Sequence, residues 1–536
     1  MRPRAVLVAA IVGAVLVSAN VYLALTVGFT ETGNLLTATM AVALARLARR
    51  PLAPEETFLA QAFASCAGMC TAASGLSSVV PALAAAGQAP SGWAIVPFGA
   101  AVGTLGVLAG AFLGPTLLER EKLVFPTGRA TAETIVALHG RTPGARAIML
   151  ALGAGVAGAV TLLRDALGWI PGMLAAPFVP AGLRVGIGVS PALLGIGALV
   201  GPATCVALVA AGCVTWLGVA PFLGLGDDYT TLIGWIVWPA VALMMSEPAW
   251  MAIAAVANIG RGGRSLYDVR ASLRDAGPPR AALLVALAAA AVTVVAARAA
   301  FGLHPLVALA VLVIAILPAA AAARAAGRTD VIPGESGGQI AQSIVGLAVR
   351  GGIGASMSAG ILVMGSSTYA GVALMNLRAR ALLGFPLRRS IAVMAAGAAF
   401  GALCGFCAYT LIARHAVPGS PSLPAPSMRA WRAVAVSVAG TAALPAGAPV
   451  AALAAFGAGL LACALRTRWP RVPAPVALGI GAILPLSATA TLLLGGAAAG
   501  VAGRLRPAWC DAHLVKLAAG AIMGESLVAV AVGLAS

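Results

Sequence analysis

Two polar stretches interrupt an otherwise strongly apolar chain, and their side chains are the ones that could do chemistry. The first runs from Asn20 to Asn34, and the second runs from Gly327 to Gln342. Both combine glycine with hydroxyl, amide and carboxylate groups, which can bind a polar substrate or carry a proton at membrane depth. We expect the two stretches to face each other near the middle of a bilayer and to line a path for a transported substrate.

Acidic residues within apolar sequence are the candidate proton carriers. A charged side chain at the centre of a membrane costs at least about 2.5–3.5 kcal/mol, so each one is expected to have a function or a partner. Burial raises the pKa of a carboxyl group toward neutrality, as a proton carrier requires. Asp330 and Glu133 are the predicted proton-coupling residues. Asp330 could instead cap the following helix, and Glu133 could form a static ion pair with Arg129 on one helix face.

The predicted substrate-binding residues are polar side chains in or near the two stretches. Amide and hydroxyl groups suit such a path, because they offer neutral hydrogen bonds to a polar substrate. Hydrogen bonds between helices, worth about 0.6 kcal/mol each, are the structural alternative. The acidic members would favour a cationic substrate, unless they lie at a hydrated helix end. The set comprises Asn20, Tyr22, Thr30, Glu31, Asn34, Gln61, Glu335, Gln339 and Gln342.

Two further glutamates carry weaker signals and are not included in that set. Glu247 precedes Pro248 and Trp250, which favours a position at the membrane interface. Glu525 follows Gly524 in the last apolar run, where pairing with an arginine is as reasonable as a direct function.

The composition is that of a membrane protein. The 536 residues are 61% hydrophobic and 9% charged, whereas soluble domains have about 25% charged residues. Apolar runs of about 20 residues recur along the chain, each long enough to cross a bilayer as a helix. We therefore predict an all-α polytopic protein with about 14–16 transmembrane or re-entrant helices. The net charge of +18 does not indicate nucleic-acid binding, because the arginines cluster between apolar runs as the positive-inside rule expects.

The basic segment 261–280 divides the chain into halves of similar size, residues 1–260 and 281–536. Each half contains one polar interruption, so we predict two pseudo-symmetric halves, inverted as in many secondary transporters. Arg2 and Arg4 precede an apolar run that continues past a cleavage-like Ser18-Ala19, which indicates an uncleaved first helix with a cytoplasmic N-terminus. The predicted location is the cell (inner) membrane, and a homo-oligomer is left open.

Eight cysteines lie almost entirely in apolar runs, which favours packing over a disulfide framework. Cys404 and Cys407 form a C-x-x-C pair, so an intramembrane redox or metal enzyme is one alternative to a transporter. An uncoupled channel is another. We predict no resident cofactor and no metal site, and we find no Walker loop for ATP hydrolysis.

An ordered set of short motifs resembles the oligopeptide transporter (OPT) family, in its prokaryotic branch. The resemblance spans nearly the whole chain. Single motifs are weakly specific, but their order is strongly so. They include Asn20-Val21-Tyr22 with Gly28 and Thr30, Phe125-Pro126 through Glu133, Ser190-Pro191-Ala192-Leu193, Gly327 through Gln342, Leu423-Pro424-Ala425-Pro426, Leu484-Pro485-Leu486-Ser487, and Gly524-Glu525-Ser526-Leu527.

The resemblance implies a secondary transporter that moves short peptides or metal chelates, coupled to protons, by alternating access, and that is not an enzyme. Its partners would be membrane lipids and that small-molecule substrate. Departures from the family pattern bear on the substrate and the ion. Thr26 stands where lysine is common, Arg328 replaces an acid, and Val372 and Asn376 stand where two carboxylates of a family motif are usual.

Overall fold

In the part of the chain that the structure describes, the regular elements are helices and one short antiparallel ribbon, β1 (Met173–Ala175) with β2 (Gly186–Gly188). The computed structural model describes residues 2–28, 30, 32–139, 144–177, 183, 185–224, 229–260, 280–329, 332–349, 352–420, 422–439 and 445–535. The predicted basic linker thus lies outside the described residues, except for Arg280, which begins a helix.

The helices of the first half are α1 (Pro3–Thr26), α2 (Asn34–Leu47), α3 (Pro54–Gly68), α4 (Cys70–Ser74), α5 (Val79–Ala85), α6 (Gly92–Gly114), η1 (Pro115–Arg120), α7 (Pro126–Leu138), α8 (Gly144–Thr161), η2 (Leu162–Ala166), α9 (Pro191–Val200), α10 (Pro202–Cys213), η4 (Val214–Val219), η5 (Ala220–Leu223) and α11 (Tyr229–Gly260). Those of the second half are α13 (Arg280–Phe301), α14 (Pro305–Thr329), α15 (Gly334–Ala348), α16 (Ile353–Leu383), α17 (Leu387–His415), α18 (Pro426–Ala439), α19 (Ala448–Arg466), α20 (Pro475–Ile483), α21 (Leu486–Leu505) and α22 (Pro507–Ala535).

Eleven helices in the described part of the chain are long and apolar enough to cross a membrane, and three shorter apolar helices accompany them. A 20-residue helix is about 30 Å long, which matches the hydrocarbon thickness of a bilayer. The prediction of a polytopic helical protein is confirmed. The count of 14–16 segments and the symmetry of the halves stay predictions.

Both polar stretches interrupt helices. α1 ends at Thr26, and α2 begins only at Asn34, after Gly28 and Gly33 have turned the chain at φ 77° and 62°. Glycine adopts this left-handed conformation without a steric penalty. In the second half, α14 ends at Thr329 and α15 begins at Gly334.

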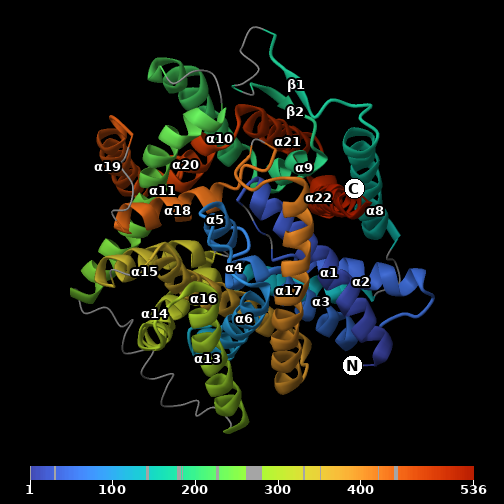
Figure 1. Ribbon diagram of the computed structural model, residues 1–536. Coiled ribbons are helices and arrows are strands. Elements are labelled where there is room, and N and C mark those ends of the chain that lie inside the picture. The colour runs from blue at the N-terminus through green and yellow to red at the C-terminus, as the bar shows by residue number, and fades with distance from the viewer. Residues whose placement is uncertain are drawn as a thin grey trace.

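The helices form two groups, and each group combines segments from both halves of the sequence. In one, α1–α7 pack with α13–α18. In the other, α8–α11 pack with α19–α22. Figure 1 shows this directly, because blue helices lie beside yellow ones and green helices lie beside red ones. Helix α1 contacts members of both groups, including α3, α17 and α22.

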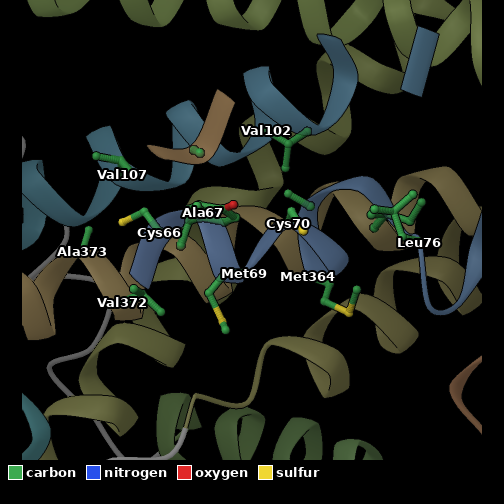
Figure 2. Close-up of a cluster of buried hydrophobic side chains, with 14 of the residues drawn as sticks. Cys66, Ala67, Met69, Cys70, Leu76, Val102, Val107, Met364, Val372 and Ala373 are labelled. Atoms are coloured by element: carbon green, nitrogen blue, oxygen red, sulfur yellow. The ribbon is translucent and has the colours of Figure 1, made fainter. Parts of the chain in front are cut away.

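The core of the first group combines small side chains with large aromatic ones, such as Phe98, Tyr369 and Trp431. Figure 2 shows side chains of α3–α4, α6 and α16 meeting in one buried cluster, among them Cys66, Cys70, Val102, Met364 and Ala373. Cys66 and Cys70 are buried free thiols within it. They pack as small apolar residues, as the composition favours.

Two short helices, α9 and α20, repeat one pattern. Each starts at a proline, Pro191 or Pro475, and contains Leu-Gly-Ile-Gly-Ala. α9 packs against α21 and α22, whereas α20 packs against α10 and α11. The glycines make these contacts close, because an added Cβ would overlap backbone carbonyl oxygens. The pairs are Gly195 with Ala518, Gly197 with Leu492, Gly479 with Ala240, and Gly481 with Leu208.

A second pair of matching features anchors the interrupted helices. Phe125 and Ala425 have φ values of 46° and 45°, and each directly precedes a proline that begins a helix. The amide of Phe125 donates to the carbonyl of Gly327 at 3.1 Å, and the amide of Ala425 donates to that of Leu25 at 2.7 Å. These bonds tie α7 to the end of α14 and α18 to the end of α1.

Candidate functional site

A cavity of about 400 Å³, called here the central cavity, opens where the two interrupted stretches meet. The first stretch supplies Gly28, Thr30 and Thr32, and the second supplies Ile332 and Glu335. The two stretches that the sequence singles out therefore border one space. The remaining lining residues are Ala24, Met69, Thr71, Ala72, Ser77, Ser78, Met364, Thr368, Ser427 and Trp431.

Glu335 is the one charged residue among the described residues that line the central cavity. It lies in the first turn of α15, where the exposed amides of a helix N-terminus favour a carboxylate. The indole Nε1 of Trp431 donates to Glu335 Oε1 at 3.3 Å. A single carboxylate among hydroxyl groups can accept hydrogen bonds from a cationic group while the hydroxyls bind neutral amides.

A second cavity of about 460 Å³, the side cavity, adjoins the first and shares Gly28, Ile332 and Glu335 with it. It extends toward α10, α11, α20 and α21. Its polar lining residues are Thr204, Glu247, Glu335 and Gln339. Glu335 thus borders both spaces.

A third cavity of about 630 Å³, the ionic cavity, lies beside the end of α1, where Tyr22 and Thr26 line it. Glu525 is buried here and accepts hydrogen bonds from four residues. The donors are Tyr22 Oη at 3.3 Å, Arg164 Nη1 at 3.1 Å, Ser190 Oγ at 2.9 Å and the backbone amide of Ala192 at 2.7 Å. The pairing of Glu525 with an arginine, one of the two alternatives from the sequence, is what the structure contains.

Asp165 holds the other edge of the same guanidinium. Arg164 Nε and Nη2 donate to the two carboxylate oxygens of Asp165 at 2.6 and 2.7 Å. Arg164 Nη1 also donates to the carbonyl of Val189. The guanidinium therefore has two carboxylate partners, and one bond ties it to the chain just before α9.

Four of the predicted substrate-binding side chains join helices instead of lining the three cavities. Asn20 donates to the carbonyl of Gly68 at 2.8 Å, and Asn34 accepts from Ser65. Gln61 donates to Asn376 at 2.9 Å. Gln342 donates to the carbonyl of Trp431 at 2.8 Å. These contacts correspond to the helix–helix alternative, and a role in binding stays a prediction.

The other predicted residues divide by location. Thr30 and Glu335 line the central cavity, Gln339 lines the side cavity, and Tyr22 lines the ionic cavity. Glu31 and Asp330 lie outside the described residues.

Glu133 is exposed and pairs with Arg129 Nε at 2.8 Å. This is the static ion pair that the spacing of four residues allowed. A part in proton coupling stays a prediction for Glu133, as it does for Asp330.

Two residues that line cavities were not among the predicted site residues. Glu247 was expected at the membrane interface, yet it lines the side cavity. Arg164 was not singled out, although it is the half-buried partner of Glu525 and lines the ionic cavity. The signal available for Arg164 was its position within a few residues of an apolar span. The signal for Glu247 was the A-x-x-x-x-M-x-E pattern, which Ala240–Glu247 shares with Ala518–Glu525.

Candidate membrane spans, broken helices and polar cavities between them define a multi-pass membrane transporter. Residues 2–535 match the family model described as OPT oligopeptide transporter protein. The chain belongs to the OPT oligopeptide transporter family, whose members are transporters and not enzymes. Its substrate is therefore a small molecule such as an oligopeptide. A comparison with curated proteins found no significant match.

Family membership decides against the enzyme alternative built on Cys404 and Cys407. Both cysteines lie in α17, where Cys404 is half-buried and Cys407 is exposed, and both are free thiols. Neither cysteine is among the described residues that line the three cavities.

Proposed function

We propose that this protein moves short peptides across the cell membrane by proton-coupled alternating access, with the central cavity as its substrate site. The observation that carries the proposal is the shared lining of that cavity, where Thr30 and Thr32 from one interrupted stretch face the same space as Glu335 from the other. Interrupted helices that converge on one cavity are typical of substrate sites in secondary transporters.

The lining chemistry favours peptides over metal chelates as the first substrates to test. Hydroxyl groups of Thr71, Ser77, Ser78 and Thr368 can bond to peptide amides without selecting a side chain. Glu335 can accept from an ammonium group. Chelates of iron remain the second class, because the family resemblance includes them.

Two pseudo-symmetric halves would provide the moving parts. Support comes from the repeated pattern of α9 and α20, whose contacts with the opposite half correspond. The matching anchors at Phe125 and Ala425 point the same way. Two such halves, inverted relative to each other, can rock around a fixed site and expose it to either side in turn.

The proton would be carried by a carboxylate that both faces of the membrane can reach in turn. Asp330 follows the end of α14 in the second interrupted stretch and is the first candidate, with Glu133 as the second. The cytoplasmic N-terminus and the location in the cell (inner) membrane follow from the arginine pattern and belong to the same proposal.

Uptake by proteoliposomes tests this function. The vesicles would be challenged with labelled tri- to hexapeptides and, separately, with labelled iron chelates, with and without an acidic exterior. Saturable, gradient-driven accumulation of peptide that Asp330→Asn abolishes is the expected result. Coupling that survives Asp330→Asn but fails in Glu133→Gln would move the proton to Glu133. Flux without saturation would contradict a transporter and favour the uncoupled channel.

A further inference from the structure

Glu247 and Glu525 occupy corresponding places in two helices that pack in the same way. Gly479 of α20 packs closely against Ala240 of α11, and Gly195 of α9 packs closely against Ala518 of α22. Each glutamate follows seven residues after its alanine, at positions 247 and 525. The two carboxylates can therefore be compared as the same position in two similar settings.

Their partners differ completely. Glu525 receives hydrogen bonds on both oxygens and pairs with Arg164. Glu247 Oε2 is buried and has no hydrogen-bond partner among the described residues. Glu247 also makes no ion pair with any arginine or lysine that the structure describes. A carboxylate oxygen without a donor is costly at this depth unless something else binds it.

The residue that precedes each short helix accounts for part of this difference in hydrogen bonding. Ser190 precedes α9, and its hydroxyl donates to Glu525. Ala474 precedes α20 at the corresponding position, and an alanine methyl group cannot donate. Ala474 and Glu247 both line the side cavity. Both positions thus line a cavity, but only Ser190 supplies a donor to its glutamate.

Two more acceptors face the side cavity. Glu335 lines it from α15, and Gln339 lies one turn further along the same helix. Gln339 is only 3% exposed. No lysine, arginine or histidine is present among the described residues that line this cavity. The described lining of this space therefore holds two carboxylates and one amide without a counter-charge.

We propose that Glu247, Glu335 and Gln339 bind the positively charged ammonium group at the amino terminus of a peptide substrate. An ammonium group has three donors and no acceptor, so two carboxylates and one amide oxygen can satisfy it fully. Charge-assisted bonds of this kind are the strong ones, and a dry site strengthens them. The inference rests on the proposed peptide transport and adds to it the group that is recognised.

The test compares two pools of alanine-rich tri- to hexapeptides, one with free amino termini and one acetylated. Binding to purified full-length protein is measured by equilibrium competition, so transport is not required. Wild type should prefer the free-amine pool by on the order of tenfold to a hundredfold, the range expected for hydrogen bonds to charged groups. Glu247→Gln and Glu335→Gln, which keep the shape of the side chain, should each reduce that preference to below about threefold.

Glu119→Gln is the matched control, because Glu119 is an exposed carboxylate outside these cavities. It should leave the preference at the wild-type value. Thermal unfolding of each variant identifies any loss of folded protein, and Glu335→Gln serves if Glu247→Gln is unstable.

The outcomes are distinct. Equal affinity of wild type for both pools, or an unchanged preference in both cavity variants, would overturn the ammonium site and leave the peptide function standing. Failure of wild type to bind either pool would contradict the peptide function and the inference together. Binding that depends on pH but not on acetylation would assign the carboxylates to a proton and overturn the inference.

Discussion

Arg164 Nη1 lies 3.1 Å from Glu525 Oε1 and joins the segment after α8 to the last helix of the chain. Asp165 neutralises the same guanidinium from its other edge. Glu525 also receives bonds from α1 and from the start of α9. One buried carboxylate therefore holds together four segments that are far apart in the sequence.

Glu525→Ala should destabilise the protein strongly. The change leaves the donors of Tyr22, Ser190 and Ala192 without their acceptor, and each buried donor left unpaired costs about 1–3 kcal/mol. Thermal unfolding in detergent, followed by tryptophan fluorescence, measures the loss. Glu55→Ala is the control, because the Glu55–Arg389 pair is more exposed and such surface pairs are worth about 0–1 kcal/mol. Similar losses for both variants would contradict the role assigned to Glu525.

Gly197→Ala and Gly481→Ala should each destabilise the second helix group by about 1–3 kcal/mol, as overpacking does. At both positions an added methyl group would overlap a backbone carbonyl, that of Leu492 or Leu208. Gly155→Ala is the control in α8, where a methyl group would meet nothing within 4 Å. That change should be neutral or stabilising by up to about 1 kcal/mol, because alanine favours a helix more than glycine does. Unfolding in detergent should separate the two classes, and no separation would argue against close packing of α9 and α20.

Ala425→Gly should stabilise the protein by about 1 kcal/mol. The alanine is held at φ 45°, where a non-glycine residue carries a strain of about 1–3 kcal/mol. Glycine relieves that strain but costs entropy in the unfolded chain, so only part of it is recovered. Ala430→Gly, inside α18, should instead destabilise by about 1 kcal/mol. A loss of stability in Ala425→Gly would contradict the strained turn.

Gly28→Ala should reduce peptide uptake by more than the loss of stability from its left-handed backbone would cause. A methyl group there would lie 2.8 Å from Pro426 Cγ, at a residue that lines both the central and the side cavity. Gly87→Ala is the matched control, since its φ of 71° is close to the 77° of Gly28 while nothing lies within 4 Å. Both should lose about 1–2 kcal/mol to the left-handed backbone. Peptide uptake should fall only in Gly28→Ala, and equal uptake in the two variants would exclude the contact as its cause.

The class of protein and the position of its polar interruptions could be predicted from local sequence. Apolar runs of span length require helices in a bilayer, because no water is available for free backbone groups. Glycine at Gly28 and Gly33 and the polar residues around Glu335 mark where those helices break. The ordered motifs indicated the family, which the match over residues 2–535 confirms.

Side-chain partners could not be predicted in the same way, because they depend on which helices become neighbours. Four polar side chains were predicted to bind substrate from their residue types, yet each bonds to a neighbouring helix. They are Asn20, Asn34, Gln61 and Gln342. Spacing along one helix does predict short-range pairs, as for Arg129 and Glu133. It contains no information about a partner 361 positions away, such as Arg164 for Glu525.

The sequence by itself therefore determined a multi-pass helical transporter with two interrupted helices and a set of costly acidic residues. Only the tertiary structure decided which acids are satisfied and which face open space. Glu247 and Glu525 look alike in sequence and each lines a cavity, but packing places a serine and an arginine beside Glu525 and leaves Glu247 Oε2 without a donor among the described residues. The physical reason is that burial sets the cost of a charge, whereas the three-dimensional neighbours determine whether that cost is offset.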